Sequence, residues 1–351
     1  MLLESRLGIA LVSYYAKATS LTQPPSVNQQ LKRRVNMNTI KTLALRPEAA
    51  HVKQASKLLR DGDLVAFPTE TVYGLGADAG NDRAVATIYQ VKGRPQFNPL
   101  IVHVADQEIA RRYVEWTPLA EQLAQAFWPG PLTLVLPRKK NAGLSDLVSA
   151  GLPTVAVRVP KHPVAQAVLA EFGGAIAAPS ANPSGQISPT SPAHVRSGLG
   201  GRISAIVDGG ECGVGLESTI LELDGTVRLL RPGGLAKEDI EAQIDRPVLT
   251  TVSDDKIKAP GQLKSHYAPR AQVRLNAKNW HPGEARLGFG AVECDLNLSP
   301  AEDLVEAAAN LFAHLHRLDA EGRNTIAVSP IPHEGLGLAI NDRLQRAAAP
   351  R

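Results

Sequence analysis

Apolar positions along the first two thirds of the chain alternate between the spacing of helices and that of strands. Residues 48–60 place their apolar side chains on one helical face, and the apolar run 64–67 that follows indicates a short buried strand. The same two patterns predict helices at 81–92, 117–128 and 163–172 and strands at 100–104, 132–136, 154–159, 175–178 and 203–207. Alternation of this kind is typical of an α/β domain.

A hairpin and a second α/β region follow. Two apolar runs within 218–230 are joined by Asp224-Gly225, which readily adopts the positive φ angles of a tight turn and adds an antiparallel component. Beyond a polar, irregular stretch, apolar runs indicate strands at 273–275, 287–289 and 325–328. Ser299, Pro300 and Glu302 have the arrangement of a capping box, which predicts a helix that starts at Pro300.

These patterns divide the chain into four parts. We expect an extension at 1–37, a larger α/β domain at 38–244, a linker or lid at 245–270 and a small α/β domain at 271–351. The extension fits a disordered segment, with Met37 as an alternative initiator. It also fits an organelle transit peptide, because it is basic and poor in acidic residues.

Charge and cysteine content narrow the classes of function. The formal net charge is +4, but the first 36 residues hold five basic residues and one acidic residue, so residues 37–351 hold 33 of each sign. A neutral body argues against a broad RNA-binding surface and leaves room for a local basic site. The isolated Cys212 and Cys294 exclude a Cys-rich zinc site and fit a cytoplasmic protein. No apolar run is long enough to span a bilayer.

Three segments place polar groups directly after predicted strands or helices. Residues 67–76 read Phe-Pro-Thr-Glu-Thr-Val-Tyr-Gly-Leu-Gly, residues 92–95 read Lys-Gly-Arg-Pro, and residues 177–185 read Ala-Ala-Pro-Ser-Ala-Asn-Pro-Ser-Gly. Strand ends are where α/β sheets bind ligands, and two cations around a glycine can address a polyphosphate. Each segment also fits a simpler interpretation, either a turn or a helix end that favours positive charge. The chain has no P-loop motif, and Gly335-Leu336-Gly337 lacks the third glycine of a dinucleotide fingerprint.

Together with further motifs, these segments closely resemble the YrdC-like family of threonylcarbamoyl-AMP synthases. The additional matches keep their order along the chain and are Asn98-Pro-Leu-Ile-Val-His103, Trp128-Pro-Gly-Pro-Leu-Thr133, Thr154-Val-Ala-Val-Arg158, Glu217-Ser-Thr-Ile220 and Leu230-Arg-Pro-Gly233. Ala259-Pro-Gly261 and His266-Tyr-Ala-Pro269 resemble the linker of the longer, two-domain form. The resemblance implies a twisted open mixed sheet flanked by helices, plus a smaller Rossmann-like α/β domain.

The family activity implied is formation of threonylcarbamoyl-AMP and pyrophosphate from L-threonine, bicarbonate or CO2, and ATP with Mg2+. The product serves the N6-threonylcarbamoyl modification of adenosine 37 in tRNAs that read ANN codons, through a downstream tRNA threonylcarbamoyl transferase complex, with at most weak tRNA contact. By resemblance, L-threonine is bound by Thr69, His103, Arg158, Ala178 and Ser218. ATP is bound by Lys92, Gln96, Thr154, Ser180, Asn182, Ser188, Arg231 and Tyr267.

Lys92 and Arg94 are the candidate catalytic residues, because fixed cations stabilise the charge that develops on phosphate and departing pyrophosphate. Residues 262–265 depart from the Met-Lys-Tyr-Arg form of the family, so no lid contact is carried over to them. Taken alone, several of these residues have structural interpretations, and His103 fits an ordinary core histidine. A similar domain occurs in hydrogenase maturation proteins, but those carry zinc-finger cysteines that this chain lacks.

Overall fold

The computed structural model describes residues 40–250 and 259–350, so the predicted extension at 1–37 lies outside the described residues. The helices are α3 (Ala49–Arg60), α4 (Asp82–Lys92), α5 (Gln107–Ala110), α6 (Pro118–Phe127), α7 (Asp146–Ser149), α8 (Pro163–Phe172), α9 (Pro192–Leu199), α10 (Lys237–Ile244), α11 (Leu304–Ala320) and α12 (Leu336–Ala348). The strands are β1 (Leu43–Leu45), β2 (Val65–Phe67), β3 (Gly74–Asp78), β4 (Ile101–His103), β5 (Leu132–Pro137), β6 (Thr154–Arg158), β7 (Ile176–Ala177), β8 (Ala205–Val207), β9 (Thr219–Leu223), β10 (Val227–Arg231), β11 (Leu249–Thr250), β12 (Gln272–Arg274), β13 (Ala285–Gly288), β14 (Leu296–Asn297) and β15 (Thr325–Val328).

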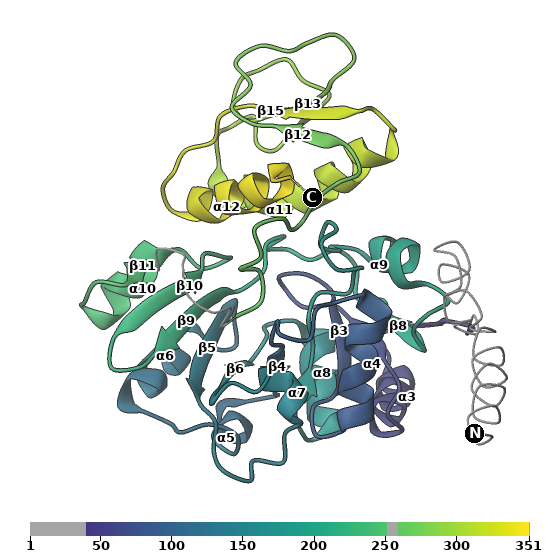
Figure 1. Cartoon of the computed structure of the whole chain (residues 1–351), viewed down its shortest axis with the longest axis vertical. Coiled ribbons are helices and arrows are strands. Elements are labelled where there is room, and N and C mark those ends of the chain that lie inside the picture. Colours follow the sequence, from purple (N-terminus) through teal and green to yellow (C-terminus); the bar gives the residue numbers. More distant parts are fainter. Residues whose placement is uncertain (1–39, 251–258, 351) are drawn as a thin grey trace, which may run out of the picture. The chain divides into compact units, whose positions relative to one another are not determined.

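A large mixed sheet forms the first domain, as the alternating pattern predicts. Its strands follow the order β1-β8-β2-β3-β7-β4-β6-β5-β9-β10-β11 (Figure 1). The predicted hairpin is confirmed, since β9 and β10 pair antiparallel around Asp224-Gly225. β11 lies within the stretch expected to be the linker, yet it pairs in parallel with β10 and extends the sheet.

The sequence pattern missed the central strand β3, which contains two glycines. A Cβ atom on Gly76 would lie 2.7 Å from a ring carbon of Phe67 on the neighbouring strand β2. Glycine at position 76 therefore leaves room for the ring of Phe67, although it lowers the strand signal of the sequence. The pairing of β2 with β3 holds residues 68–73, the loop between them, at the end of the two strands.

The ends of α4 are confirmed and place the Lys-Gly-Arg segment. The Asn81 side chain accepts hydrogen bonds from the amides of Arg83 and Ala84, both at 3.1 Å, which caps the first turn. Gly93 adopts φ +63° and ends the helix, because a left-handed residue cannot continue it. Lys92 consequently lies in the last turn with its side chain buried.

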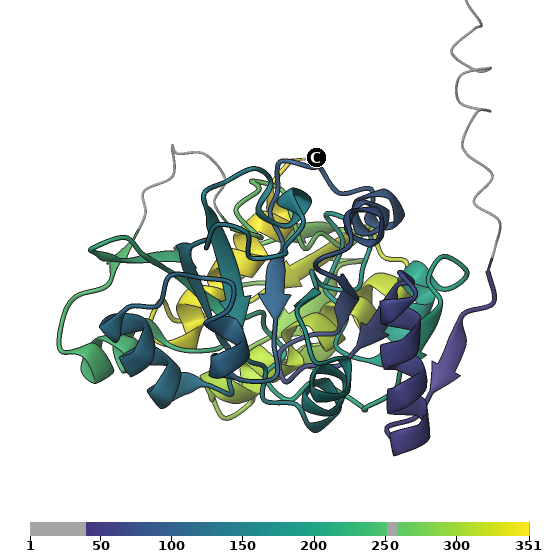
Figure 2. The same ribbon diagram turned by 90° about the horizontal axis from the view of Figure 1, so that it is seen from below.

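Helices cover the large sheet over separate apolar clusters. α3 and α8 pack together over one cluster with β2 and β8, and β1 forms the outer edge of the sheet beside α3, both purple in Figure 2. A small cluster around Ile101, Ala156 and Leu230 packs against Ala259, which belongs to the predicted linker. Among the described residues, no helix is both long and apolar enough to cross a membrane.

The second domain is a four-stranded parallel sheet in the order β12-β15-β13-β14, as expected for a small α/β domain. Figure 1 shows α11 and α12 on the same side of it. The predicted start of the first helix at Pro300 is wrong. Glu302 has φ +60°, which breaks the helical path, and α11 begins at Leu304 with Asp303 as its N-cap. Ser299 instead accepts a hydrogen bond from the amide of Asp303.

Candidate active site

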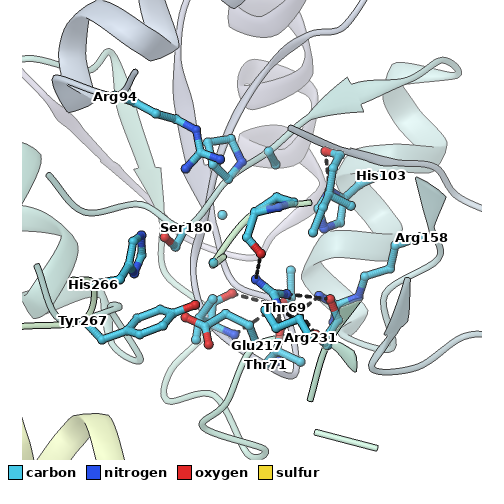
Figure 3. A pocket seen from close by; sticks show the side chains of 18 residues that line it. Thr69, Thr71, Arg94, His103, Arg158, Ser180, Glu217, Arg231, His266 and Tyr267 are labelled. Carbon is cyan, nitrogen blue, oxygen red and sulfur yellow. Dashed lines mark hydrogen bonds between the residues drawn. The ribbon is translucent and has the colours of Figure 1, made fainter. Parts of the chain in front are cut away.

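One small cavity gathers residues from strand ends of the large sheet and from the linker (Figure 3). Its volume is about 40 Å³, and most of the residues predicted from the sequence line it. These are Thr69, Arg94, His103, Arg158, Ala178, Ser180, Ser218, Arg231 and Tyr267. His266, which the linker motif was expected to bring to the nucleotide pocket, also lines it, as does Glu217, to which no individual role was assigned.

Five predicted residues do not line this cavity: Lys92, Gln96, Thr154, Asn182 and Ser188. Gln96 is exposed, and the half-buried Thr154 opens strand β6. Asn182 donates hydrogen bonds to the carbonyl oxygens of residues 183 and 186, at 2.9 and 2.8 Å, and lines a different pocket. Ser188 is buried and donates to Glu217, so it contacts the site through that carboxylate.

Lys92 stabilises the site through backbone hydrogen bonds and does not line the cavity. Its ammonium group is buried and donates to the carbonyl oxygens of Ser180 and Asn182, both at 2.5 Å. Burial lowers the pKa of Lys92 well below its usual range, and the nearby Arg94 and Arg202 lower it further. The Lys-Gly-Arg segment and the Ser180 loop, remote in sequence, are thereby held together, and both supply residues to the cavity.

Arg158 organises the other end of the cavity. Its guanidinium donates to the hydroxyl of Thr71 at 3.0 Å, to the carboxylate of Glu70 at 2.7 Å and to the carbonyl oxygen of Gly130 at 3.3 Å. Thr71 and Thr69 are hydrogen bonded at 2.7 Å. The loop that follows β2 is therefore fixed by a buried arginine at the end of β6, and Figure 3 shows Thr69, Thr71 and Arg158 on the same side of the cavity.

The imidazole of His103 lies at the same end of the cavity as Arg158 and is uncharged. It lies directly opposite Arg158 in the register of β4 and β6. Burial, followed by the charge of Arg158, lowers the pKa of His103 to about 3. The ring therefore carries no charge near neutral pH, and it can take part as a hydrogen-bonding or packing group.

Arg231 and Ser218 form a further part of the cavity lining. Arg231 donates to the carbonyl oxygen of Ser218 at 2.9 Å and to its hydroxyl at 3.1 Å. The hydroxyl of Ser218 also bonds the buried Thr133 at 2.7 Å. Arg94 is held by the carbonyl oxygens of Asn98 and Pro99, at 3.2 and 2.8 Å. Three guanidinium groups thus surround a space whose other polar groups are mainly hydroxyls, an arrangement suited to anions.

Glu217 is the exception in this cationic cavity. Its carboxylate accepts hydrogen bonds from Ser188 at 2.5 Å and from Arg343 of α12 at 2.7 Å. Burial raises the pKa of Glu217, but Arg343, Arg231 and Ser188 outweigh burial and lower it to about 2. Glu217 belongs to a recognised motif, whereas no sequence signal pointed to Arg343, because the helix that carries it was not predicted.

The lowered pKa of Glu217 predicts a loss of stability in acid. An unfolded glutamate titrates near 4.5, so the ionised, paired form stabilises the fold fully above about pH 5. That contribution is lost as the pH falls towards 2. We expect the difference in unfolding free energy between the wild type and Glu217→Gln, measured with urea, to shrink from pH 6 to pH 3. A difference that does not change with pH would contradict the assigned ionisation.

The described residues do not fit a resident metal ion. The nearest carboxylates are already engaged, Glu70 with Arg158 and the amide of Lys161, and Glu217 with Ser188 and Arg343. Within 40–250 and 259–350, no three His, Cys, Asp or Glu residues are placed to share a metal. Magnesium commonly binds through substrate phosphates and water with few protein ligands, so the site is compatible with its arrival on a nucleotide.

Comparison with protein families gives two adjacent matches. Residues 57–233 match the Sua5/YciO/YrdC family, described as "Telomere recombination", and residues 235–349 match "Threonylcarbamoyl-AMP synthase, C-terminal domain". A threonylcarbamoyl-AMP synthase of Bacillus subtilis is 44% identical over an alignment of 325 residues, which covers 86% of this chain and 93% of the relative.

Two further relatives bear on the site and on the second domain. The crystal structure of P. abyssi Sua5 complexed with L-threonine superposes with a TM-score of 0.80 at 38% identity, and the match covers 88% of this chain and 98% of that one. A threonylcarbamoyl-AMP synthase of Vibrio vulnificus is 39% identical over 187 residues, which are 99% of that protein and only 52% of this chain. Proteins of about half this length therefore carry the same name.

Proposed function

The chain belongs to the Sua5/YciO/YrdC family and carries the threonylcarbamoyl-AMP synthase C-terminal domain, and from this premise we propose that it is an L-threonylcarbamoyladenylate synthase. It joins L-threonine, bicarbonate or CO2, and ATP to give threonylcarbamoyl-AMP and pyrophosphate. The product supplies the N6-threonylcarbamoyl group of adenosine 37 in tRNAs that read ANN codons, through a separate transferase complex. The observation that carries the proposal is the convergence of Arg94, Arg158 and Arg231 on one cavity.

L-Threonine occupies the end of the cavity formed by Thr69, His103, Arg158, Ala178 and Ser218. A guanidinium has five N–H groups, and the described contacts of Arg158 use three of them, which leaves donors for the substrate carboxylate. The similarity to a Sua5 that binds L-threonine supports this placement. Because His103 is uncharged, Arg158 is the residue at this end that pairs with the charge of the substrate carboxylate.

ATP occupies the part of the cavity lined by Arg231, Ser180 and Tyr267. Among the cations, Arg94 is the one to which we assign the stabilisation of charge on the phosphates during the reaction. Lys92 holds the Ser180 loop in position, and Asn182 and Ser188, which do not line the cavity either, support its lining. Gln96 and Thr154 reach the nucleotide only if its base extends beyond the present cavity. Mg2+ enters with the triphosphate, since its oxygens and water supply most of the ligands that the ion prefers.

The reaction proceeds in two bond-forming steps. The threonine amine adds to the carbon of CO2 and loses a proton, which gives a carbamate; bicarbonate supplies this CO2 with loss of water. A carbamate oxygen then attacks the α-phosphorus of ATP, and the bond to pyrophosphate breaks. Guanidinium groups fixed before the reaction stabilise the charge that develops on the phosphates.

ATP requires a more open conformation than the one described. Sites for ligands of this size have volumes of about 300–1,000 Å³, far above the 40 Å³ of this cavity. Pro260, Gly261, His266 and Tyr267 of the linker cover the cavity, so their movement admits the nucleotide. The amide of His266 donates to the carbonyl oxygen of Arg346, and the guanidinium of Arg346 donates to the carbonyl oxygen of Leu263. These two hydrogen bonds connect the lid to α12. A closed lid also keeps water from the reactive mixed anhydride.

The proposal predicts strict dependence on threonine. The purified chain is incubated with ATP, Mg2+, labelled bicarbonate and each amino acid in turn, and pyrophosphate and adenylate are measured. We expect threonine alone to raise pyrophosphate release at least tenfold over the rate without amino acid. RNA binding without any threonine-dependent pyrophosphate would favour the alternative function, an RNA-binding module of the same fold. We propose the cytoplasm as the location of the reaction, on the sequence argument from two isolated cysteines.

A further inference from the structure

Arg343 of the C-terminal domain is a fully buried cation beside the cavity. Its side chain has 0% exposure, although it projects from α12, whose sequence carries no recognised motif. Its Nε donates to Glu217 at 2.7 Å and its Nη1 to Asp342 at 2.6 Å, while Nη2 has no hydrogen-bond partner among the described residues. A buried guanidinium is costly unless it is paired, so its contacts with the site require an explanation.

Two of the contacts of Arg343 are residues that line the cavity. Glu217 is one, and the other is Tyr267, whose ring centroid lies 5.0 Å from the Arg343 guanidinium carbon. Tyr267 has φ +60° and 1% exposure, and its ring also packs against Phe312 of α11 at 5.7 Å. The C-terminal domain therefore fixes one aromatic ring and one carboxylate of the site.

The position of Arg343 bears on which arginine the carboxylate of Glu217 pairs with. Glu217 interacts electrostatically with Arg231 as well as with Arg343. In the described structure Glu217 is paired with Arg343, and Arg231 is hydrogen bonded to Ser218 and the Pro260 carbonyl oxygen at the cavity wall. Without Arg343, the carboxylate of Glu217 would keep its hydrogen bond from Ser188 but would lose its ion pair. It would then attract Arg231 and repel a triphosphate.

We propose that Arg343 is a positioning residue for the nucleotide: by neutralising Glu217 and packing on Tyr267, it leaves Arg231 free to bind the phosphates of ATP when the C-terminal domain is docked. This role rests on the proposed function, because it assigns the ATP end of the same cavity. Through Arg343, the C-terminal domain thus supplies the positive charge that pairs with Glu217 at the cavity.

The test separates nucleotide affinity from turnover. ATP binding is measured by calorimetry without threonine, and pyrophosphate release is measured at varied ATP and varied threonine. We expect Arg343→Gln to weaken ATP binding and to raise the KM for ATP about tenfold or more, while the KM for threonine stays within about twofold. Arg343→Lys keeps a charge and is expected to retain part of the affinity.

A double variant keeps the test meaningful if Arg343→Gln fails to fold. Glu217→Gln with Arg343→Gln removes both buried charges, and we expect its ATP affinity to return to within about threefold of the wild type. Arg274→Gln is the matched control, since it breaks the ion pair with Glu284 in the same domain away from the cavity and should leave ATP binding unchanged.

Two results would overturn the inference. One is ATP binding by Arg343→Gln equal to that of the wild type, and the other is an equal loss in the single and double variants, which indicates a purely structural role. Calorimetry distinguishes this failure from that of the proposed function. A chain whose ATP affinity depends on Arg343 but that never releases pyrophosphate with threonine would overturn only the proposed function.

Discussion

Deletion of residues 255–351 is expected to lower threonylcarbamoyl-AMP formation by about 10²-fold or more, on the scale seen when a group that stabilises transition-state charge is lost. The deletion removes Pro260, Gly261, His266 and Tyr267 from the cavity lining. It also leaves the buried Glu217 without its arginine. Threonine-dependent pyrophosphate release measures the effect, and circular dichroism and thermal melting establish that the remaining domain is folded.

A second truncated chain separates the two causes of that loss. Truncated protein with Glu217→Gln lacks the uncompensated carboxylate, so it should recover part of the ATP affinity while the lid residues remain absent. The Vibrio vulnificus relative of about half this length indicates that the activity itself does not demand a second domain in every member. A truncated chain as active as the full one would contradict the roles assigned here to the linker and to α12.

Arg94→Ala is expected to lower adenylate formation by about 10²-fold with little change in melting temperature. Arg94 lines the cavity, and its bonds to the carbonyl oxygens of Asn98 and Pro99 lie within its own loop. The catalytic loss therefore exceeds the structural one. Pyrophosphate release and thermal melting are measured on the same preparation, and near-normal turnover would contradict the assignment.

Two companion variants calibrate this result. Lys92→Ala is expected to lose similar activity and also to melt at a lower temperature, since its two hydrogen bonds join α4 to the remote Ser180 loop, whereas those of Arg94 stay within one loop. Arg83→Ala removes an exposed cation from the surface of the same helix α4 and should change neither quantity. If Arg94→Ala and Arg83→Ala behaved alike, general charge rather than position would explain the site.

Short-range signals in the sequence determined most of the secondary structure and the order of the functional segments. Asn81 and Gly93 act on backbone groups within one turn of themselves, and Asp224-Gly225 sets the φ angles of its own turn, so these features were readable without the fold. The motifs that carry Thr69, His103, Arg158 and Ser218 were equally local. All four line one cavity, and their roles in binding stay a prediction.

The tertiary structure alone decided what each charged side chain does, because charge pairing depends on residues distant in the chain. Lys92 faces backbone carbonyls at positions 180 and 182 rather than the cavity, which no local pattern specifies. Glu217 and Arg343 are 126 positions apart and meet only when α12 packs beside the linker. Likewise, β3 forms despite its glycines, because close packing against Phe67 outweighs their weak strand propensity.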